Sequence, residues 1–228
     1  MPQQTTWENE YKRPQLVTKD EAPQKDVLRF LKFLRRKEGV ELSHLRVLDL
    51  GCGTGRNANC IAELGNIVIG YDISPTAISL ATSRAKKMNV DATFQVFDMG
   101  TPYPLPDAWA NLILDITASN SLTEIERANY LSEAHRVLKP GGYFFVKTLC
   151  KDGDKNAKAL IKQHPGKEHD TYINQDMQLV ERVFTRKDFV SLYSPYFTII
   201  SLEQKTSYTR FNGRSYKRNF WLAYMKKI

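Results

Sequence analysis

The sequence is poor in cysteine and has no long apolar segment. Its 228 residues include three cysteines, none of them in a CxxC pair, which argues against a disulfide framework and against a structural zinc site. No run of about 18 apolar residues occurs, so we expect no membrane-spanning helix. The first residues lack the apolar stretch of a signal peptide. Together these absences predict a protein of the reducing cytoplasm.

Positive charge is in excess, but only in one part of the chain. Residues 1–142 hold 17 basic and 17 acidic side chains, whereas residues 143–228 hold 16 basic and 8 acidic ones, so the net charge of +8 falls wholly in the second part. Such an excess is typical of a surface that meets an acidic partner, or of a solvated face. With 42% hydrophobic and 25% charged residues, the composition is that of a folded domain.

Short apolar runs alternate with helical patterns along most of the chain. Such a run predicts a buried strand, and apolar residues three to four positions apart predict a helix. The predicted helices begin near residues 24, 57, 75 and 123, and Ser74 is a suitable N-cap before Pro75. Strands separated by helices form βαβ units and a parallel sheet. The predicted strands cover residues 47–50, 67–71, 93–96, 112–114 and 143–146.

The pattern changes after the fifth predicted strand. Residues 151–176 are polar and carry little strand signal. Thr185 and Asp188 have the spacing of a capping box at the start of a helix. Two last apolar runs, 197–202 and 220–225, predict a pair of strands. Because the connection between them is short and has no helical pattern, we expect an antiparallel pair at the edge of the sheet.

Glycines and carboxylates stand where the first three predicted strands end. Gly51, Gly53 and Gly55 follow the first strand, and glycine there lets the backbone approach a ligand closely. Asp72 ends the second strand and can accept from both hydroxyls of a ribose, and Asp98 ends the third and can accept from an adenine amine. Ligands of open α/β sheets bind at this edge. The pattern therefore predicts a ligand that contains adenosine.

The spacing of the glycines distinguishes between adenosine ligands. A dinucleotide site needs G-x-G-x-x-G, with the pyrophosphate at a helix N-terminus. The loop here reads G-x-G-x-G and is preceded by Asp49. A carboxylate at that position would repel pyrophosphate and suits a ligand with a cationic ammonium or sulfonium group. The residues therefore favour S-adenosylmethionine over a nicotinamide dinucleotide.

The order of these motifs resembles that of class I S-adenosylmethionine-dependent methyltransferases, over about residues 25–150. The matching segments are Val47–Gly55, Asp72–Pro75, Phe97–Met99 and the turn Leu138–Gly142. The resemblance implies an α/β fold, a Rossmann-like three-layer αβα sandwich whose seven-stranded, mostly parallel sheet has an antiparallel last strand. It implies a single domain, 1–228, made of an N-terminal lid and helix (1–40), a cofactor-binding core (41–150), a substrate cap (151–195) and edge strands (196–228).

The resemblance also implies roles in binding S-adenosylmethionine, whose product is S-adenosylhomocysteine. The glycines would wrap the methionine part, and Asp49 would organise their loop and the methionine amino group. Ile73 and Met99 would flank the adenine, and Asp115 would lie near the methyl group. The implied cofactor contacts are Asp49, Gly51, Cys52, Gly53, Gly55, Asp72, Ile73, Asp98, Met99 and Asp115.

Candidate acceptor contacts lie at the N-terminus and in the segment after the fifth strand. The family often covers its cofactor with the N-terminal segment, so Trp7 and Tyr11 are predicted to contact substrate, as are His169 and Tyr172 from the cap. Asp115 and His169 are the predicted catalytic groups, because a base is needed if the nucleophile carries a proton. The histidine spacing matches no metal-site template, so we predict no metal ligands.

The chain departs from two methyltransferase subclasses. The (Asn/Asp)-Pro-Pro-Tyr motif of many amino-group methyltransferases would start at Asp115, but the chain reads Asp-Ile-Thr-Ala there. This departure disfavours an exocyclic base amine or a glutamine amide as the acceptor. Methylation of cytosine C5 needs a nucleophilic cysteine, and none of the cysteines stands in a Pro-Cys or Thr-Cys site.

Three functions remain open at this point. The first is methyl transfer to an O, N or S nucleophile of a small molecule. The second is methylation of RNA or protein, and the third is a non-catalytic partner subunit that binds S-adenosylmethionine. The second would use the basic C-terminal surface, since single-stranded RNA favours basic residues interleaved with aromatic ones. The residues predicted for that contact are Lys205, Arg210, Arg214, Lys217 and Arg218.

Overall fold

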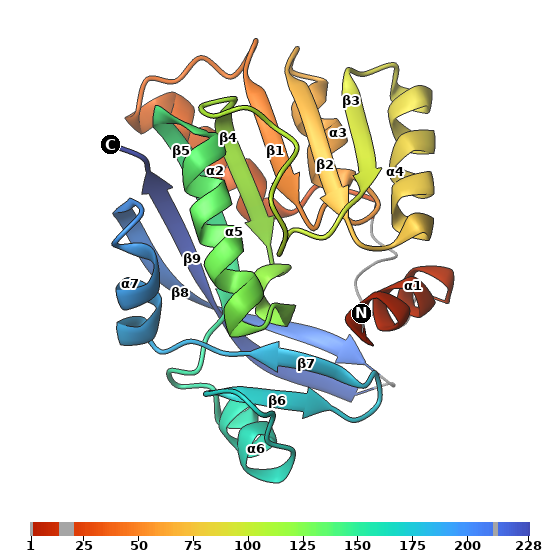
Figure 1. The fold of residues 1–228 in the computed structure, drawn as a ribbon, viewed down its shortest axis with the longest axis vertical. Helices are drawn as coiled ribbons and strands as arrows, with labels where there is room; N and C mark the ends of the chain where they lie inside the picture. Colours follow the sequence, from red (N-terminus) through yellow and green to blue (C-terminus); the bar gives the residue numbers. More distant parts are fainter. Residues whose placement is uncertain (1, 14–20, 212–213) are drawn as a thin grey trace.

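Seven strands within the described residues (2–13, 21–211 and 214–228) form the central sheet of the computed structural model (Figure 1). They are β1 (Arg46–Leu50), β2 (Ile67–Asp72), β3 (Ala92–Val96), β4 (Ala110–Ile116), β5 (Leu138–Leu149), β8 (Thr198–Phe211) and β9 (Arg214–Lys226). Their order is β3-β2-β1-β4-β5-β9-β8. The first five strands pair in parallel, and β9 is antiparallel to both neighbours. The predicted mostly parallel sheet with an antiparallel last strand is confirmed.

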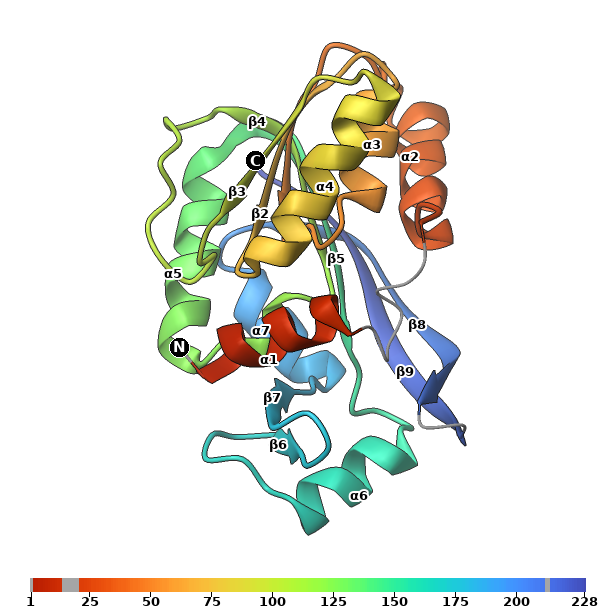
Figure 2. The same cartoon turned by 90° about the vertical axis from the view of Figure 1, so that its right-hand side faces the viewer.

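Helices cover both faces of the sheet (Figure 2). Apolar side chains of α2 (Lys25–Lys37), α3 (Arg56–Ala62) and α4 (Pro75–Met88) pack on one face. Those of α5 (Glu124–Val137) and α7 (Arg186–Tyr193) pack on the other. The sheet thus separates two apolar cores, and the predicted three-layer αβα sandwich is confirmed.

Side-chain caps begin several of these helices. Ser74 accepts a hydrogen bond from the third residue of α4, as the sequence predicts. Thr185 and Asp188 form the predicted capping box at the start of α7, and Thr123 and Glu126 form another at the start of α5. Since a cap satisfies backbone N–H groups that a helix cannot pair internally, it fixes where α4, α5 and α7 begin.

The chain after β5 contains more regular structure than the sequence indicates. Helix α6 (Lys155–Gln163) and the hairpin of β6 (Thr171–Asn174) and β7 (Leu179–Arg182) lie beyond the carboxyl end of β5 (Figure 1). The expectation of little strand in residues 151–176 is therefore wrong for β6, since a four-residue strand is too short to show a period. Strands β8 and β9 also extend past their predicted ends, because they continue as a hairpin that projects beyond the sheet.

Helix α1 (Pro2–Lys12) lies below the carboxyl ends of β2 and β3 (Figure 1). It contacts α4 on one side and β7 on the other. The first helix of the chain thereby bridges the parallel sheet and the segment that follows β5. Among the described residues, no helix combines the length and the apolar character needed to cross a membrane.

Candidate cofactor and acceptor site

A cavity of about 570 Å³ opens at the carboxyl ends of the parallel strands, between α1 and the β6–β7 hairpin. Its wall combines residues of the glycine loop, of β2, of α1 and of the segment after β5. Most of the side chains predicted from the sequence to form the site take part in it. Those that line the cavity are Trp7, Tyr11, Gly51, Cys52, Gly53, Asp72, Ile73, Asp98 and Met99.

The glycine loop has a backbone that other residues would strain. Gly51, Gly53 and Gly55 have φ values of +69°, +54° and +72°, in the left-handed region that glycine adopts without a steric penalty. A Cβ atom on Gly53 would stand 2.7 Å from the hydroxyl oxygen of Tyr11. Glycine is therefore needed at this position both for the turn and for the close approach of α1.

Asp72 ties the glycine loop to the end of β2. Its Oδ2 accepts a hydrogen bond from the backbone N–H of Gly53, and its Oδ1 accepts one from that of Ser74, each at 2.9 Å. The side chain faces the cavity but the residue is only 7% exposed. Burial raises the pKa of this carboxyl to about 6, against the effect of the backbone hydrogen bonds. The loop geometry thus depends on one carboxylate.

Asp49 is buried near the glycine loop and does not itself line the cavity. Burial raises the pKa of its carboxyl to about 8, and the neighbouring carboxylates of Asp115 and Asp72 add to the rise. Its Oδ2 has no hydrogen-bond partner among the described residues. A cationic ligand group near the loop would offset this cost, because it favours the ionised carboxylate.

Asp115 holds the turn that follows β4. It is fully buried, and its Oδ2 accepts a 2.7 Å hydrogen bond from the hydroxyl of Tyr130. Its Oδ1 accepts from the backbone N–H groups of Ala118 and Ser119 at 3.0 and 3.2 Å. Since the residue does not line the cavity, the predicted contact with the reacting methyl group becomes an organising role. It fixes the 3₁₀ turn η2 (Ser119–Ser121) against the sheet.

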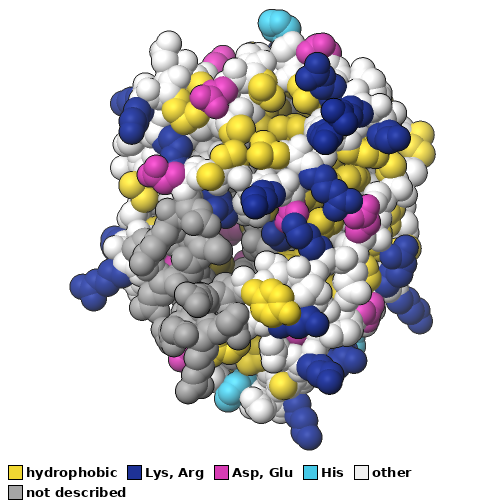
Figure 3. All heavy atoms as spheres, turned by 180° about the vertical axis from the view of Figure 1, so that it is seen from behind, with side chains coloured by type: hydrophobic (Ala, Val, Ile, Leu, Met, Phe, Trp, Pro, Cys, Tyr) yellow, Lys and Arg dark blue, Asp and Glu magenta, His cyan; other side chains and the backbone are white. Residues whose placement is uncertain are grey.

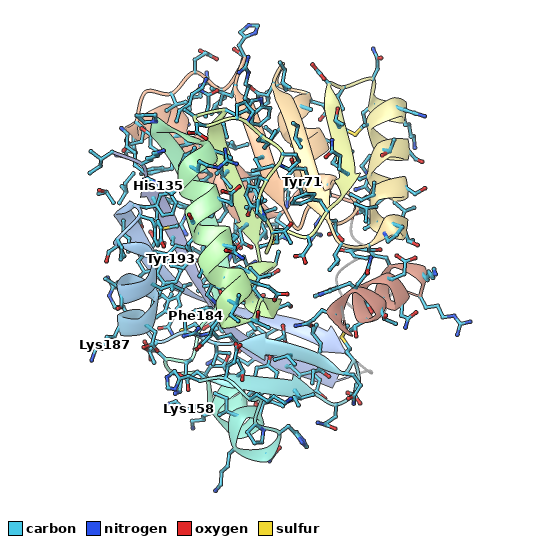
Figure 4. The ribbon with its side chains drawn as sticks, viewed as in Figure 1. Tyr71, His135, Lys158, Phe184, Lys187 and Tyr193 are labelled. Atoms are coloured by element: carbon cyan, nitrogen blue, oxygen red, sulfur yellow. The ribbon has the colours of Figure 1, made fainter. Side chains whose placement is uncertain are left out.

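A buried arginine supports the same turn. Arg127 of α5 donates to the carbonyl oxygens of Ser119 and Leu122 at 2.6 and 2.7 Å. Its guanidinium carbon lies 5.1 Å from the ring centre of Phe184. Phe184 and Tyr193 lie next to α5 on the side of α7 (Figure 4). This packing holds the wall of the cavity that Leu122 forms.

The adenine end of the predicted site contains two aromatic residues that the sequence reading missed. Tyr71 and Phe97 both line the cavity, with ring centres 4.5 Å apart. Asp98 is fixed beside them, because its Oδ1 accepts a 2.9 Å hydrogen bond from the backbone N–H of Gly100. An apolar slot next to a carboxylate suits a purine with an exocyclic amine. Tyr71 ends an apolar run, which in the sequence is indistinguishable from a core position.

Helix α1 is attached to both sides of the cavity. The carboxylate of Glu8 accepts from Ser74 Oγ at 2.5 Å, and from the backbone N–H and the hydroxyl of Thr76 at 3.1 and 2.6 Å. The hydrogen bonds from Ser74 and Thr76 lower the pKa of Glu8 to about 2. At the other end of the helix, Gln3 donates to the carbonyl oxygens of Ser121 and Val180. The sequence reading identified the aromatic residues of α1 but not these polar anchors.

Two predicted acceptor contacts lie elsewhere. His169 is a surface residue with a 66% exposed side chain, 3.3 Å from Asp170, and it does not line the cavity. Tyr172 is buried in the cap, where its hydroxyl donates to Glu181 and accepts from Arg218. Neither position fits the predicted contact with substrate. The segment after β5 instead lines the cavity through Gly166, Lys167, Glu168, Ile173, Gln178 and Val180.

Carboxylates near His169 have structural partners. Ligand atoms of His169, Asp170 and Asp188 lie within 4.8 Å of one another. However, Asp170 pairs with Lys151 at 2.5 Å, and Asp188 accepts from Thr185 in the capping box of α7. One oxygen of each carboxylate thus has a protein partner, while Asp170 Oδ2 has no hydrogen-bond partner among the described residues.

The basic residues predicted to contact RNA include two with internal partners. Lys205 pairs with the buried carboxylate of Asp26, and Arg218, 15% exposed, lies against Tyr172 with Asp154 3.7 Å away. Lys217 is exposed. On the face seen from behind, Lys and Arg side chains are scattered among apolar and acidic ones (Figure 3). The side chains of Arg210 and Arg214 lie outside the described residues.

The fold is that of a class I S-adenosylmethionine-dependent methyltransferase, and the comparison with known proteins agrees. A family model described as "Methyltransferase domain" matches residues 41–193, so the chain belongs to that family. It is similar to a demethylmenaquinone methyltransferase of Tropheryma whipplei, with 35% identity over 100 residues, 44% of this chain and 40% of that protein. It is also similar to a ubiquinone biosynthesis O-methyltransferase of Rhizobium etli, with 29% identity over 127 residues, 55% and 49% of the two chains.

The matched part of the chain covers less than half of either relative's length. Solved structures match over most of the fold. A methyltransferase from Methanosarcina mazei superposes with a TM-score of 0.73 at 24% identity, covering 84% of this chain and 96% of that one. A Burkholderia thailandensis 1,6-didemethyltoxoflavin-N1-methyltransferase, solved with its substrate and S-adenosylhomocysteine, gives 0.71 at 19% identity, covering 99% and 87%.

The electrostatics beside the cavity fit S-adenosylmethionine. Gly51 and Gly53 line the cavity, and their lack of a Cβ atom lets Ala118 and Tyr11 pack closely against the loop. The carboxyl of Asp49, with its raised pKa and an unpartnered oxygen, lies where a cationic ligand would stabilise its ionised form. S-adenosylmethionine carries two such cationic groups, the ammonium and the sulfonium.

Proposed function

We propose that this protein transfers a methyl group from S-adenosylmethionine to an O, N or S nucleophile of a small molecule. The observation that carries the proposal is a single cavity that joins the glycine loop and Asp72 to a second half lined by α1, η2 and the β6–β7 hairpin. A ligand in the second half is surrounded by protein on several sides, which suits a small molecule better than a polymer.

The chain's residues mainly position the two reactants in this proposal. Asp72 holds the ribose hydroxyls, Asp98 holds the adenine amine, and Asp49 compensates the positive charge of the methionine end. Asp115 fixes the turn that separates the two halves. Bound S-adenosylmethionine supplies an activated methyl group on its sulfonium. Because that group needs little further activation, the protein contributes chiefly orientation and exclusion of water.

Methyl transfer to RNA or protein has less support in the described residues. Two of the predicted RNA contacts, Lys205 and Arg218, are already engaged in ion pairs within the protein. A phosphate backbone would have to compete with Asp26 and Asp154 for them. These internal ion pairs explain part of the excess of basic residues in the C-terminal third, because the basic side chains neutralise buried carboxylates.

The assay for the proposed function uses S-adenosylmethionine with a tritiated methyl group and a cell extract separated into small molecules, RNA and protein. We expect label in the small-molecule fraction, and none when S-adenosylhomocysteine is in excess. Label in RNA or protein alone would contradict the choice of acceptor. Binding of S-adenosylhomocysteine without transfer to any fraction would favour a non-catalytic partner subunit.

We further propose that α1 is a lid over the cofactor, held by Glu8. Replacing Glu8 by glutamine removes the charge-assisted hydrogen bonds to Ser74 and Thr76. We expect the Kd of S-adenosylhomocysteine to rise roughly tenfold, since charged hydrogen bonds contribute about 1.5–3 kcal/mol each and glutamine retains part of them. Isothermal calorimetry measures the change. Glu63→Gln, at an exposed position at the end of α3, is the control, and equal affinities of the two variants would contradict the role.

A further inference from the structure

Four described carboxylates line the cavity, and three of them belong to its cofactor half or to a helix cap. Asp72 receives two backbone N–H groups of the glycine loop and the α4 cap. Asp98 is held by Gly100, and Glu126 closes the capping box of α5 with Thr123. The fourth carboxylate comes from the segment after β5 and lies beside residues of the acceptor half. The four are Asp72, Asp98, Glu126 and Glu168.

Glu168 is oriented by the start of α5. Both of its carboxylate oxygens lie 3.1 Å from the backbone nitrogen of Glu124, the first residue of that 14-residue helix. A helix N-terminus favours negative charge. Because one N–H is shared by two oxygens, each oxygen retains lone pairs for a ligand. Among the described residues, no lysine or arginine forms an ion pair with Glu168.

Other groups able to take a proton are poorly suited to this half of the cavity. His169 is on the surface outside it, and His135 packs against Tyr196 and Phe197. Burial raises the pKa of the Cys52 thiol well above its usual value, which keeps it protonated. Gln178 and the apolar side chains nearby have no group that accepts a proton.

We propose that Glu168 binds the acceptor and takes its proton during methyl transfer, so that the acceptor is a neutral hydroxyl or amino compound. This inference rests on the proposed function. The acceptor's oxygen or nitrogen forms a bond to the methyl carbon, and the electron pair of the broken carbon–sulfur bond stays on sulfur. The acceptor's proton moves to a carboxylate oxygen of Glu168. A carboxylate or thiolate acceptor would be repelled by Glu168 and has no proton to give.

The test compares Glu168→Gln with Glu124→Gln. The control changes a carboxylate next to Glu168 that is 55% exposed and outside the cavity, and it leaves the Glu124 backbone N–H in place. With the small-molecule extract fraction as acceptor, we expect kcat of Glu168→Gln to fall roughly 100-fold, as is typical when a general base is removed. With S-adenosylmethionine saturating at every pH, kcat of wild type should decline toward acidic pH, and that decline should be absent from the residual kcat of Glu168→Gln. The Kd of S-adenosylhomocysteine should stay within a factor of two in both variants.

A second readout does not depend on activity. Saturation-transfer NMR without cofactor measures the binding of catechol, aniline and benzoate to each variant. We expect wild type and Glu124→Gln to prefer catechol and aniline, and Glu168→Gln to lose that preference and bind benzoate more strongly. The same preference in all three proteins, or an unchanged kcat in Glu168→Gln, would overturn the inference.

Three further outcomes of these experiments would each contradict part of the proposal. A loss of S-adenosylhomocysteine binding in Glu168→Gln would show that the residue supports the cofactor half and would overturn its role toward the acceptor. A lower melting temperature with an unchanged kcat would show that Glu168 only caps α5, and would overturn its role toward the acceptor. If wild type transfers methyl to no fraction but the NMR preference follows Glu168, the proposed function fails and only the binding part of the inference stands.

Discussion

Replacing Asp72 by alanine is expected to raise the Kd of S-adenosylhomocysteine at least 100-fold. The substitution removes both hydrogen bonds that fix the glycine loop and the start of α4. It also removes the carboxylate proposed to bind the ribose. Hydrogen bonds to a charged group contribute about 1.5–3 kcal/mol each, and every 1.4 kcal/mol corresponds to tenfold in affinity. Isothermal calorimetry with S-adenosylhomocysteine gives the value directly.

Two further variants separate the causes of that loss. Asp72→Asn keeps the size of the side chain but replaces one acceptor oxygen by a donor, so we expect most of the affinity to be lost. Asp91→Ala removes an exposed carboxylate before β3 and should bind as wild type does. A Kd for Asp72→Ala within threefold of wild type would contradict the assignment of the cofactor site.

The affinity for S-adenosylhomocysteine is expected to increase with pH between 5.5 and 7.5, by up to about tenfold per pH unit. In the free protein the pKa of Asp49 is about 8, raised by burial and then by Asp115 and Asp72, while Arg56 acts in the opposite direction. Most Asp49 is therefore protonated across this range. The ligand's ammonium group favours the ionised carboxylate, so binding releases a proton and is stronger at higher pH.

Calorimetry in two buffers of different ionisation enthalpy measures the released proton. The Asp49→Asn variant cannot ionise at this position, so its affinity for S-adenosylhomocysteine should be lower and it should release less proton on binding. The proton release that remains would come from Asp72, whose pKa is about 6. The stability of the free protein changes with pH in the opposite direction: the contribution of Asp49 decreases as the pH rises. Since the folded pKa of Asp49 lies above its ordinary value of 3.8, its favourable contribution is complete below about pH 4 and is lost as the pH rises through about 8. Proton uptake on binding would contradict this account.

The parallel half of the fold could be predicted because each of its signals is local. Buried strands such as β1 and β4 appear as continuous apolar runs, and Ser74 marks the start of α4 by itself. The glycine loop and Asp72 follow from the same pattern, since parallel strands end at one edge of the sheet. Asp72 and Asp98 both line the cavity at that edge.

The acceptor half could not be predicted in the same way, because its residues meet only through tertiary packing. Glu168 and His169 are neighbours in sequence, but one lines the cavity and the other faces solvent. A histidine in a polar segment is the more conspicuous candidate base, and nothing local shows which of two adjacent side chains points inward. The position of Arg218 could not be predicted for the same reason. Its ion-pair partner Asp154 lies 64 residues earlier, so the local charge pattern does not indicate the pair.

The position of α1 has a practical consequence for preparing the protein. Gln3 lines the cavity and donates hydrogen bonds to Ser121 and Val180. Any chain joined ahead of α1 therefore starts at the cavity wall and would crowd that helix. The last strand instead ends at the opposite end of the sheet, with Ile228 exposed (Figure 1). An affinity tag or a fluorescent label belongs at the C-terminus, where it leaves the site accessible.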